Sequence, residues 1–288
     1  MTNGPPPVAY WELLGTLERK EPRPEGRDVV VLSNIDQAAD TSPGAPGLSI
    51  RYVARGCENY RIGGRGYRLE AGQVMIARHD SGADCEVRRV DRLGTLGVCT
   101  LVHGGPDDLE WAQVPLIVAA DCTPVGAMLK TGAKSLWNAQ RDKISLAENL
   151  IQGIRTELPR FAQRVLSQAA AVDGAKPSTR FEMVRRAHLA QAYLHATTNR
   201  AVDLNELAAA LGVSPFRLLT AFQQSFGESP AAYHRKLRLG LAMEEAKRRG
   251  VRIGSVCDEF GFADCSSFSH AYRRTFGRSP VWSKARAA

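Results

Sequence analysis

The chain has few cysteines for its length, and they form no recognisable pattern. Its 288 residues include six cysteines (Cys57, Cys85, Cys99, Cys122, Cys257 and Cys265), with no Cys-x-x-Cys pair and no histidine at metal-ligand spacing. Structural zinc sites and disulfide frameworks both depend on such spacings. We therefore expect neither, and we interpret most of these cysteines as small buried hydrophobic residues.

Long apolar runs are also absent. No stretch approaches the ~20 uninterrupted apolar residues that a membrane-spanning helix needs. The first ten residues, MTNGPPPVAY, show neither the charged region nor the apolar region of a secretory signal. These two observations predict a cytoplasmic protein that has no membrane partner.

An excess of positive charge is missing from the first part of the chain. Residues 1–179 contain 21 Lys and Arg and 21 Asp and Glu, so the formal net charge of +8 lies entirely in residues 180–288. Such an asymmetry favours a polyanionic partner for the last third. A basic surface that is merely solvated is the alternative.

The basic third contains a helical unit that occurs twice. In residues 203–227, an Asp203 cap, an apolar helical stripe and Gly212 predict one short helix. Ser214 and Pro215 then open a second helix, which Gly227 closes. The same apolar and glycine positions return at offsets of 49 and 50 in residues 252–277, up to Gly277. Two short helices joined by a tight turn predict a helix-turn-helix arrangement in each copy.

The second helix of each copy has a polar face, and these two faces are the candidate surfaces for contact with DNA bases. Arg and Gln can make bidentate contacts to base edges, Ser, Thr and His offer single hydrogen bonds, and an exposed aromatic ring can contact a thymine methyl group. An ordinary solvated helix face is the alternative, and the presence of two equivalent faces disfavours it. The faces carry Phe216, Arg217, Thr220, Gln223 and Gln224 in the first copy and Ser266, Ser267, His270, Arg273 and Arg274 in the second.

A long helix is predicted between the copies, from Ser229 and Pro230 to Gly250. Twenty helical residues span roughly 30 Å. This length is close to the ~34 Å that separates successive major-groove faces of B-DNA. One chain could then place two recognition helices in adjacent turns. His234, Arg235, Lys236 and Arg238 near the start of the helix are candidates for phosphate contact, or for an ordinary solvated face.

The segment GFADCSSFSHAYRRTFGRSP, with the duplicated helical pairs, resembles the DNA-binding domain of AraC/XylS-type bacterial transcription regulators. The resemblance runs from about Phe181 to Trp282. It implies base-reading positions at Phe216, Arg217, Thr220, Ser266, Ser267 and His270. It also implies RNA polymerase as a partner. For contacts to the DNA backbone, we predict Ser214, Gln223, Gln224, Lys236, Arg273 and Arg274.

The front part is predicted to be a β-domain. Alternating or apolar stretches in residues 28–32, 47–54, 58–62, 67–77, 85–89 and 94–102, with a Gly-Gly turn at 63–64, predict a small β-barrel or jelly roll. The segment ENYRIGGRGYRLEAGQVMIARHD resembles the cupin-like ligand-binding domain of the same regulators. That resemblance implies a small-molecule effector and a homodimer.

Cupin enzymes hold a metal with a His-x-His pair followed by a Glu and a His, and this pattern is missing. His79 stands apart from Glu86 and His103, so we expect no metal, no cofactor and no catalytic residue. An apolar barrel with a few polar groups is still suited to a small molecule. Candidate effector-pocket residues are Arg51, Tyr52, Tyr60 and Met75, with core or surface positions as the alternative.

These predictions define a multidomain fold of helices and strands. The segments are an N-terminal arm (1–27), a cupin-like β-barrel (28–120), a helical dimerisation or connector region (121–171), a linker (172–179) and an all-α DNA-binding domain (180–288). In the helical region, Thr123 and Pro124 open a helix over 123–137, and Pro159 interrupts a second helical stretch over 142–170. That stretch packs against the barrel or forms a dimer contact.

Three functions remain open. The leading hypothesis is a sequence-specific, double-stranded-DNA-binding transcription regulator that has an effector-binding barrel. A purely structural barrel on the same DNA-binding domain is the second hypothesis, and an enzyme fused to a DNA-binding domain is the third. The missing metal ligands and cysteine cluster count against the enzyme. Cys265 falls in the second recognition helix, which leaves a redox-sensing role as an alternative to burial.

Overall fold

A computed structural model of the chain divides into two units. Unit 1 is Met1–Ala170 and unit 2 is Ala171–Ala288. The structure describes all residues except 1–7, 16–25, 36–38, 42–46, 63, 80–84, 90–93, 104–111, 113, 175 and 281–288. Within the strands, the side chains of residues 14, 15, 39–41, 79 and 85–89 are also outside the description.

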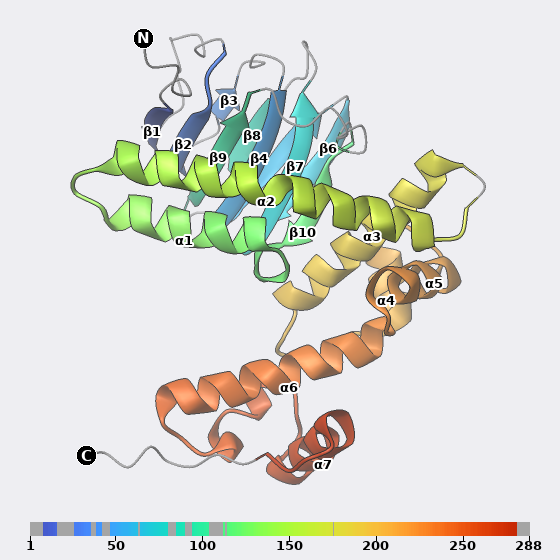
Figure 1. Cartoon of the computed structure of the whole chain (residues 1–288). Helices are drawn as coiled ribbons and strands as arrows, with labels where there is room; N and C mark the ends of the chain where they lie inside the picture. The colour runs from blue at the N-terminus through green and yellow to red at the C-terminus, as the bar shows by residue number, and fades with distance from the viewer. Residues whose placement is uncertain are drawn as a thin grey trace. The chain divides into compact units, whose positions relative to one another are not determined.

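Unit 1 contains a six-stranded sheet and a four-stranded sheet (Figure 1). The strand orders are β1-β2-β9-β4-β7-β10 and β3-β8-β5-β6. Strands β1 and β2 pair in parallel, and the other described pairs are antiparallel. The strands are β1 (Ala9–Gly15), β2 (Val29–Ile35), β3 (Ala39–Thr41), β4 (Gly47–Arg55), β5 (Cys57–Ile62), β6 (Arg65–Glu70), β7 (Gln73–His79), β8 (Cys85–Arg89), β9 (Thr95–Val102) and β10 (Leu116–Ala119).

The strand predictions hold with one error and three omissions. Strands β2, β4, β5, β8 and β9 confirm the stretches expected in those positions. The single strand expected over 67–77 is wrong, because the chain turns at Ala71 and Gly72 and forms β6 and β7. Strands β1, β3 and β10 were not predicted, and β1 lies within the expected N-terminal arm.

The β-barrel or jelly roll predicted for this part is not a closed barrel, since the described strands form two separate sheets. Among the described strands, the larger sheet ends at β1 and β10 and the smaller one at β3 and β6. The chain passes from one sheet to the other at Gly56 and Gly72, both of which have positive φ, at 78° and 84°. At Gly56 a Cβ atom would lie 2.6 Å from the Gly94 carbonyl oxygen, so the corner requires glycine. These corners split the strands into two layers.

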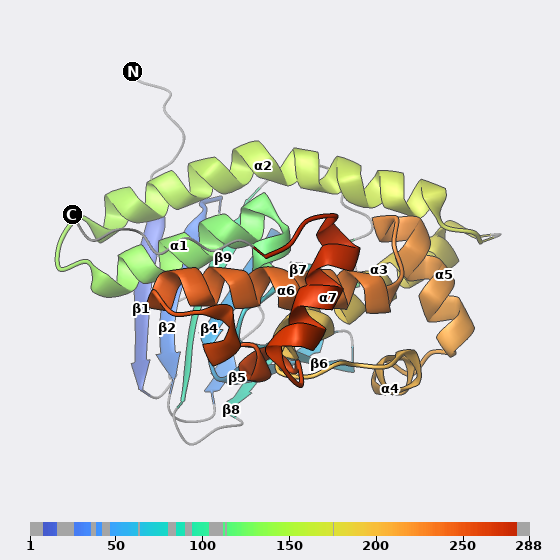
Figure 2. The same cartoon turned by 90° about the horizontal axis from the view of Figure 1, so that it is seen from below.

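Two helices cover one face of the six-stranded sheet and run antiparallel, side by side (Figures 1 and 2). They are α1 (Pro124–Asn138) and α2 (Lys143–Ala171), preceded by the short 3₁₀ turn η2 (Ala120–Cys122). Thr123 caps α1 as predicted, because its Oγ1 accepts a hydrogen bond of 2.9 Å from the Gly126 N–H.

The predicted interruption at Pro159 is wrong, because α2 continues through it. A proline inside a helix removes one backbone hydrogen bond and typically costs about 3 kcal/mol. Buried side chains flank Pro159 on both sides, among them Ile154, Leu158 and Phe161, and their burial offsets this cost. The apolar stripe therefore overrides the local breaker.

An ion pair also holds α2 on the sheet. Arg155 donates two hydrogen bonds of 2.7 Å to the carboxylate of Asp28, at the start of β2, and a third of 2.8 Å to the His103 carbonyl. Asp28 is 8% exposed, so the guanidinium compensates a largely buried carboxylate. This pair fixes the middle of α2 against the ends of β2 and β9.

The first half of unit 2 consists of α3 (Pro177–Ala196), α4 (Leu204–Ala210) and α5 (Pro215–Phe226). Their shared core includes Leu207, Leu218 and Phe222, and Tyr233 packs against it. The Asp203 carboxylate caps α4 by accepting from the N–H groups of Asn205 and Glu206. The leading helix begins at Pro177, inside the segment expected as a linker (172–179).

The second half consists of α6 (Pro230–Arg249), the 3₁₀ turns η3 (Ile253–Ser255) and η4 (Asp258–Phe260), and α7 (Cys265–Phe276). Phe268 and Tyr272 occupy the core positions that Leu218 and Phe222 fill in the first copy. The first helix of this copy is replaced by η3 and η4. It lacks the side-chain cap that Asp203 supplies to α4, since Arg252 makes no such bond, and Gly254 is a weak helix former.

Among the described residues, no helix is long and apolar enough to cross a membrane.

Candidate nucleic-acid interface

Helix α5 is held by its ends and by its buried side. The Ser214 Oγ accepts a hydrogen bond of 3.4 Å from the Arg217 N–H at the first turn, and Gly227 ends the helix at a φ of 78°. Leu218, Ala221 and Phe222 are buried. The opposite side is therefore presented to solvent in a fixed orientation. Ser214, a predicted backbone-contact residue, acts as the helix cap in this structure.

The outer face of α5 carries an exposed aromatic ring and a free guanidinium. Phe216 is 77% exposed, which is unusual for a phenylalanine, and Arg217 and Gln223 are exposed as well. Thr220 is half-buried, and its hydroxyl donates a 3.0 Å hydrogen bond to the Phe216 carbonyl. The Phe216 ring and the Arg217 guanidinium are therefore both open to solvent on this face.

Gln224 lies on the same helix but contacts the chain itself. Its amide Nε2 donates to the Asp173 carboxylate at 2.7 Å, and its Oε1 accepts from the Asp173 N–H at 3.2 Å. This pair of bonds ties the segment before α3 to α5. Gln224 would have to release Asp173 before it could reach a phosphate.

Helix α7 begins with a capping box. The Asp264 carboxylate accepts from the Ser267 N–H at 2.6 Å, while the Ser267 Oγ accepts from the Asp264 N–H at 3.2 Å. These bonds lower the pKa of Asp264, so the cap stays ionised at neutral pH. Ser267, predicted to read a base, is thus engaged in the cap, although it is exposed, as is Ser266 beside it.

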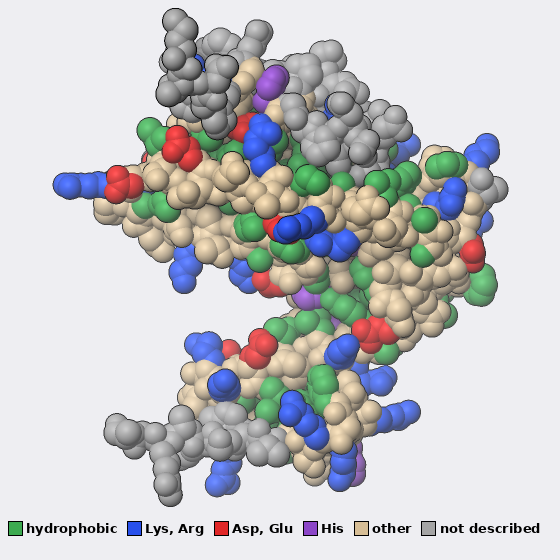
Figure 3. All heavy atoms as spheres, viewed as in Figure 1, with side chains coloured by type: hydrophobic (Ala, Val, Ile, Leu, Met, Phe, Trp, Pro, Cys, Tyr) green, Lys and Arg blue, Asp and Glu red, His purple; other side chains and the backbone are tan. Residues whose placement is uncertain are grey.

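The rest of the α7 face is basic. His270, Arg273 and Arg274 are exposed, and the Arg273 guanidinium donates to the His270 Nδ1 at 3.3 Å. Figure 3 shows Lys and Arg side chains gathered over α6 and α7 on the face in view. Both recognition helices therefore expose Arg or His next to small hydroxyl side chains.

Helix α6 packs against α3 and α5 through its first part and against η3, η4 and α7 through its later part. Lys236 is exposed and lies 3.6 Å from the Glu228 carboxylate. Two other candidates for phosphate contact, His234 and Arg238, are buried instead. His234 donates from Nε2 to the Thr197 carbonyl at 2.7 Å, and the Arg238 guanidinium stacks on Phe262. Both side chains therefore fix α6 within unit 2.

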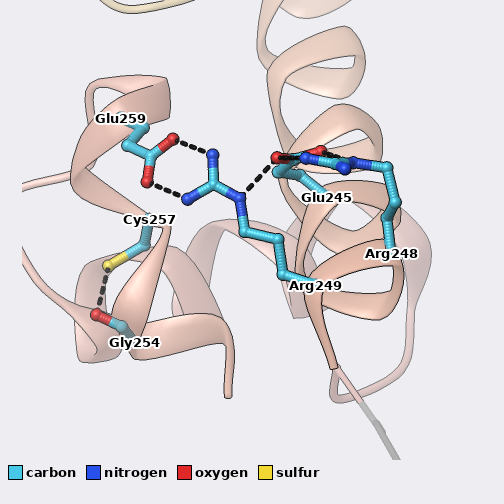
Figure 4. A network of polar contacts seen from close by, with 6 residues as sticks. All are labelled: Glu245, Arg248, Arg249, Gly254, Cys257 and Glu259. Atoms are coloured by element: carbon cyan, nitrogen blue, oxygen red, sulfur yellow. Dashed lines mark hydrogen bonds and ion pairs between the residues drawn. The ribbon is translucent and has the colours of Figure 1, made fainter. Parts of the chain in front are cut away.

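A second link fixes the C-terminal end of α6. Arg249 pairs with Glu259 of η4 through two hydrogen bonds of 2.6 and 2.8 Å, and it also donates to Glu245 (Figure 4). Glu245 receives further bonds from Arg248, which lower the pKa of Glu245 to about 2. This network holds η4 of the second copy against the end of α6.

Unit 1 brings three of the four predicted effector residues to one side of the larger sheet. Arg51 and Met75 are opposite one another across β4 and β7 and so point to the same side. The Arg51 guanidinium lies 4.4 Å from the ring centre of Tyr60, which comes from the smaller sheet. Tyr52 points to the other side, where it interacts with Lys130 and Asp121 near α1.

Sequence reasoning missed a buried carboxylate beside these residues. Glu58 is 5% exposed and accepts hydrogen bonds from the Tyr60 hydroxyl and, at 3.1 Å, from the Thr95 hydroxyl. Burial raises the pKa of Glu58, and the nearby Arg51 charge acts in the opposite direction. The two-residue spacing of Glu58 and Tyr60 on one strand was the available signal. The result is a polar cluster between two apolar sheets.

Comparisons with known proteins match the C-terminal part. A family model described as a helix-turn-helix domain matches residues 207–282. Over 89 residues, 31% of this chain, the sequence is 33% identical to the uncharacterized HTH-type transcriptional regulator YidL of Escherichia coli (strain K12) and 36% identical to the HTH-type transcriptional regulator GbdR of Pseudomonas aeruginosa (strain UCBPP-PA14). The matched stretches span only 30% and 24% of those two proteins.

A third relative is covered more fully. The XylDLEGF operon transcriptional activator 2 of Pseudomonas putida is 28% identical over 138 residues, which is 47% of this chain and 82% of that protein. Among solved structures, fatty-acid-bound ToxT from Vibrio cholerae strain SCE256 covers 88% of this chain and 93% of its own at 12% identity. The TM-score of that match is 0.32. Residues 207–282 therefore form a helix-turn-helix domain that is similar to those of known transcriptional regulators.

Proposed function

We propose that the chain is a sequence-specific transcription regulator that reads two adjacent major-groove segments of double-stranded DNA. The observation that carries the proposal is the pair of exposed faces on α5 and α7, each set on its own buried core and joined by the 20-residue helix α6. The relatives that match this part of the chain are named as transcriptional regulators, which supports the same function.

The residue roles follow from exposure. Phe216, Arg217, Ser266 and His270 are the exposed candidates for base contact. Gln223, Lys236, Arg273 and Arg274 are the exposed candidates for phosphate contact. Ser214 serves first as the cap of α5, and the N–H groups at the start of that helix suit a DNA phosphate. Ser267 serves first in the capping box of α7. Thr220 and Gln224 need a change of hydrogen-bond partner before they can contact DNA.

The binding site would have two parts. Helix α6 spans roughly 30 Å, close to one turn of B-DNA, so α5 and α7 would enter successive major grooves on one side of the duplex. The two faces differ, with Phe216 and Arg217 in one and Ser266 and His270 in the other. The site would therefore be asymmetric for one chain.

For unit 1 we propose effector binding between the sheets, in a cupin-like arrangement, on the side where Arg51, Glu58 and Tyr60 meet. One guanidinium and one carboxylate within an apolar layer favour a small polar effector over a purely apolar one. A homodimer formed through unit 1, contact with RNA polymerase and a cytoplasmic location complete the proposal. A purely structural unit 1 is the competing function for this part.

An enzymatic function finds less support. Among the described residues there is no group of three or more His, Cys, Asp or Glu side chains arranged to hold a metal ion. That search does not reach the side chains of His79 and Glu86, the predicted positions closest to a cupin metal site. The relatives of unit 2 are regulators rather than enzymes.

The DNA proposal is tested by selecting duplexes from a random pool with the full chain and measuring affinity against salt concentration. We expect one enriched site that binds about a thousandfold more tightly than scrambled duplex, as is typical of specific regulators. Arg273→Ala and Arg274→Ala should each weaken binding to both duplexes and reduce the salt slope by about one. Arg160→Ala, which removes an exposed arginine of α2 in unit 1, is the matched control. If no sequence were enriched, the proposal would be wrong.

The effector proposal is tested by thermal unfolding of the full chain with a library of small polar metabolites. A ligand that binds the folded state raises the melting temperature in a saturable way. Arg51→Met should abolish the rise while the chain still binds DNA. If no metabolite raised the melting temperature, or if the Arg51→Met chain showed the same rise, the structural role of unit 1 would be favoured.

A further inference from the structure

Two cysteines lie beside the start of the second recognition helix. Cys265 is the first residue of α7 and is exposed, whereas Cys257 is 4% exposed and belongs to the core of the same half. Both are free thiols. Cys265 directly precedes Ser266, so any group added to its sulfur would stand at the proposed DNA surface.

Gly254 brings the two thiols into one neighbourhood. The Cys257 Sγ lies 3.8 Å from the Gly254 carbonyl oxygen, as Figure 4 shows. A Cβ atom placed on Gly254 would lie 3.8 Å from the Cys265 Cβ and 3.9 Å from its Sγ. The two cysteines therefore border the same residue, which has no side chain to separate them.

The surrounding backbone is suited to a small rearrangement. The segment from Ile253 to Phe260 forms two single 3₁₀ turns instead of the α-helix that the first copy has. Short 3₁₀ turns have poorer hydrogen-bond geometry than an α-helix and are less costly to move. Burial and the neighbouring Cys265 raise the pKa of the Cys257 thiol, so Cys265, which is open to solvent, is the thiol that meets an oxidant first.

We propose that Cys265 and Cys257 form a redox pair in which oxidation by hydrogen peroxide links them as a disulfide. The Cys265 thiolate attacks one peroxide oxygen, the O–O bond breaks, and a sulfenic acid forms with release of hydroxide. The Cys257 thiolate then attacks the sulfenic sulfur, the S–S bond forms, and a second hydroxide leaves. Two thiols are oxidised by two electrons, one peroxide is reduced, and the two thiol protons leave as water with the hydroxides.

The disulfide would act on the second reading unit. Forming it draws Cys257 away from its core neighbours, which include Phe262 and Phe268, and fixes it to the first turn of α7. Ser266 and the capping pair of Asp264 and Ser267 lie in that same turn. The oxidised chain would keep the DNA contacts of α5 and lose the DNA contacts of α7. This effect on DNA rests on the proposed function, whereas the cross-link itself does not.

The chemistry is tested first, without DNA. The full chain is treated with hydrogen peroxide, blocked with an alkylating reagent and digested after Arg252 and Arg273. The peptide 253–273 holds both cysteines. We expect it to lose two hydrogens and to escape alkylation, and dithiothreitol should restore both thiols. Independent oxidation of Cys265, or cross-links to other cysteines, would overturn the proposal.

The consequence for DNA is tested on the selected duplex by fluorescence anisotropy. Peroxide should weaken binding by about tenfold, the loss expected when one set of base contacts fails, and dithiothreitol should restore it. Cys257→Ser and Cys265→Ser should each prevent the cross-link, and Cys122→Ser is the control. A cross-link that leaves DNA affinity unchanged would refute the switch alone. Failure of the reduced chain to prefer any duplex would instead refute the proposed function.

Discussion

At the scale of single residues, Ser214 shows that one side chain can have two candidate roles. As the cap of α5 it stabilises the helix that carries the first reading face. As the residue at the helix start it also stands where a DNA phosphate would approach the free N–H groups. The two roles respond differently to a negative charge.

Substitutions at Ser214 separate these roles. Ser214→Ala removes the acceptor for the Arg217 N–H and should lower the free energy of unfolding by about 1 kcal/mol. Ser214→Asp restores the cap and should recover that stability, but its charge should repel a phosphate and weaken DNA binding. Urea unfolding and anisotropy measure the two effects. Equal DNA affinity of the wild-type and Ser214→Asp chains would place the phosphate elsewhere.

Two buried histidines make the stability of unit 2 depend on pH. Burial lowers the pKa of His188 to about 4 and, with its nearby positive charges, that of His234 to about 4. An unfolded histidine titrates near 6.5. Both contributions to stability are therefore complete above pH 6.5, and they are lost as pH falls from 6.5 toward 4, because the unfolded chain then binds more protons.

Unfolding of the full chain between pH 7 and pH 4 measures this effect. We expect each histidine to contribute a loss of up to about 3 kcal/mol at pH 4. His188→Leu should flatten that slope, whereas His103→Gln, at an exposed position, should leave it unchanged. A flat profile in the wild-type chain would mean that neither imidazole is buried in its neutral form.

At the scale of elements, the two helix-turn-helix copies share a pattern but differ in their turns. Gly212 and Gly261 both have positive φ, at 63° and 72°. A Cβ atom at Gly212 would meet nothing within 4 Å, whereas at Gly261 it would lie 2.6 Å from the Arg200 Cα. The turn of the second copy is thus packed directly on the loop between α3 and α4, and this contact joins the two halves of unit 2.

The pair Gly212→Ala and Gly261→Ala tests this packing. Both substitutions impose the strain of a left-handed residue, roughly 1–2 kcal/mol. Gly261→Ala should cost clearly more, because Arg200 backbone must also move. Thermal unfolding compares the two, and hydrogen exchange should show faster opening of 253–276 in Gly261→Ala alone. Equal costs would mean that the two halves are not packed at this turn.

The sequence was sufficient to predict elements whose ends carry strong local signals. Ser214, Ser229 and the glycines at 227, 250 and 277 fixed α5, α6 and the end of α7, because caps and left-handed glycines act within one turn. The turns η3 and η4 were not predicted, because the matching apolar pattern conceals a missing cap. The interruption predicted at Pro159 was wrong for the opposite reason, since the burial of side chains on both sides of it outweighs one lost backbone hydrogen bond.

Sites that depend on pairing were less predictable. The exposure of Phe216, Arg217 and His270 follows from helical periodicity alone. The bonds that join Gln224 to Asp173 and Glu58 to Thr95 link residues that are far apart in the sequence. Arg51 and Tyr52 point to opposite sides of β4, and only the side chain on the side that faces the second sheet can join the polar cluster. No local sequence pattern shows which side that is.

At the scale of the whole molecule, charge and fold divide at nearly the same place. The excess positive charge lies in residues 180–288, and unit 2 begins at Ala171. A neutral unit with a buried polar cluster and a basic unit with two exposed helices suit different partners, a small molecule and a polyanion. We propose that the basic unit of one chain reads two grooves.

The most direct test maps base contacts on the selected duplex by methylation interference, with the wild-type, Arg217→Ala and His270→Ala chains. We predict two interference segments centred about 10 base pairs apart in the wild-type chain. Arg217→Ala should abolish base preference in one segment only, and His270→Ala in the other only. A single segment, or two segments that both variants leave intact, would contradict the account.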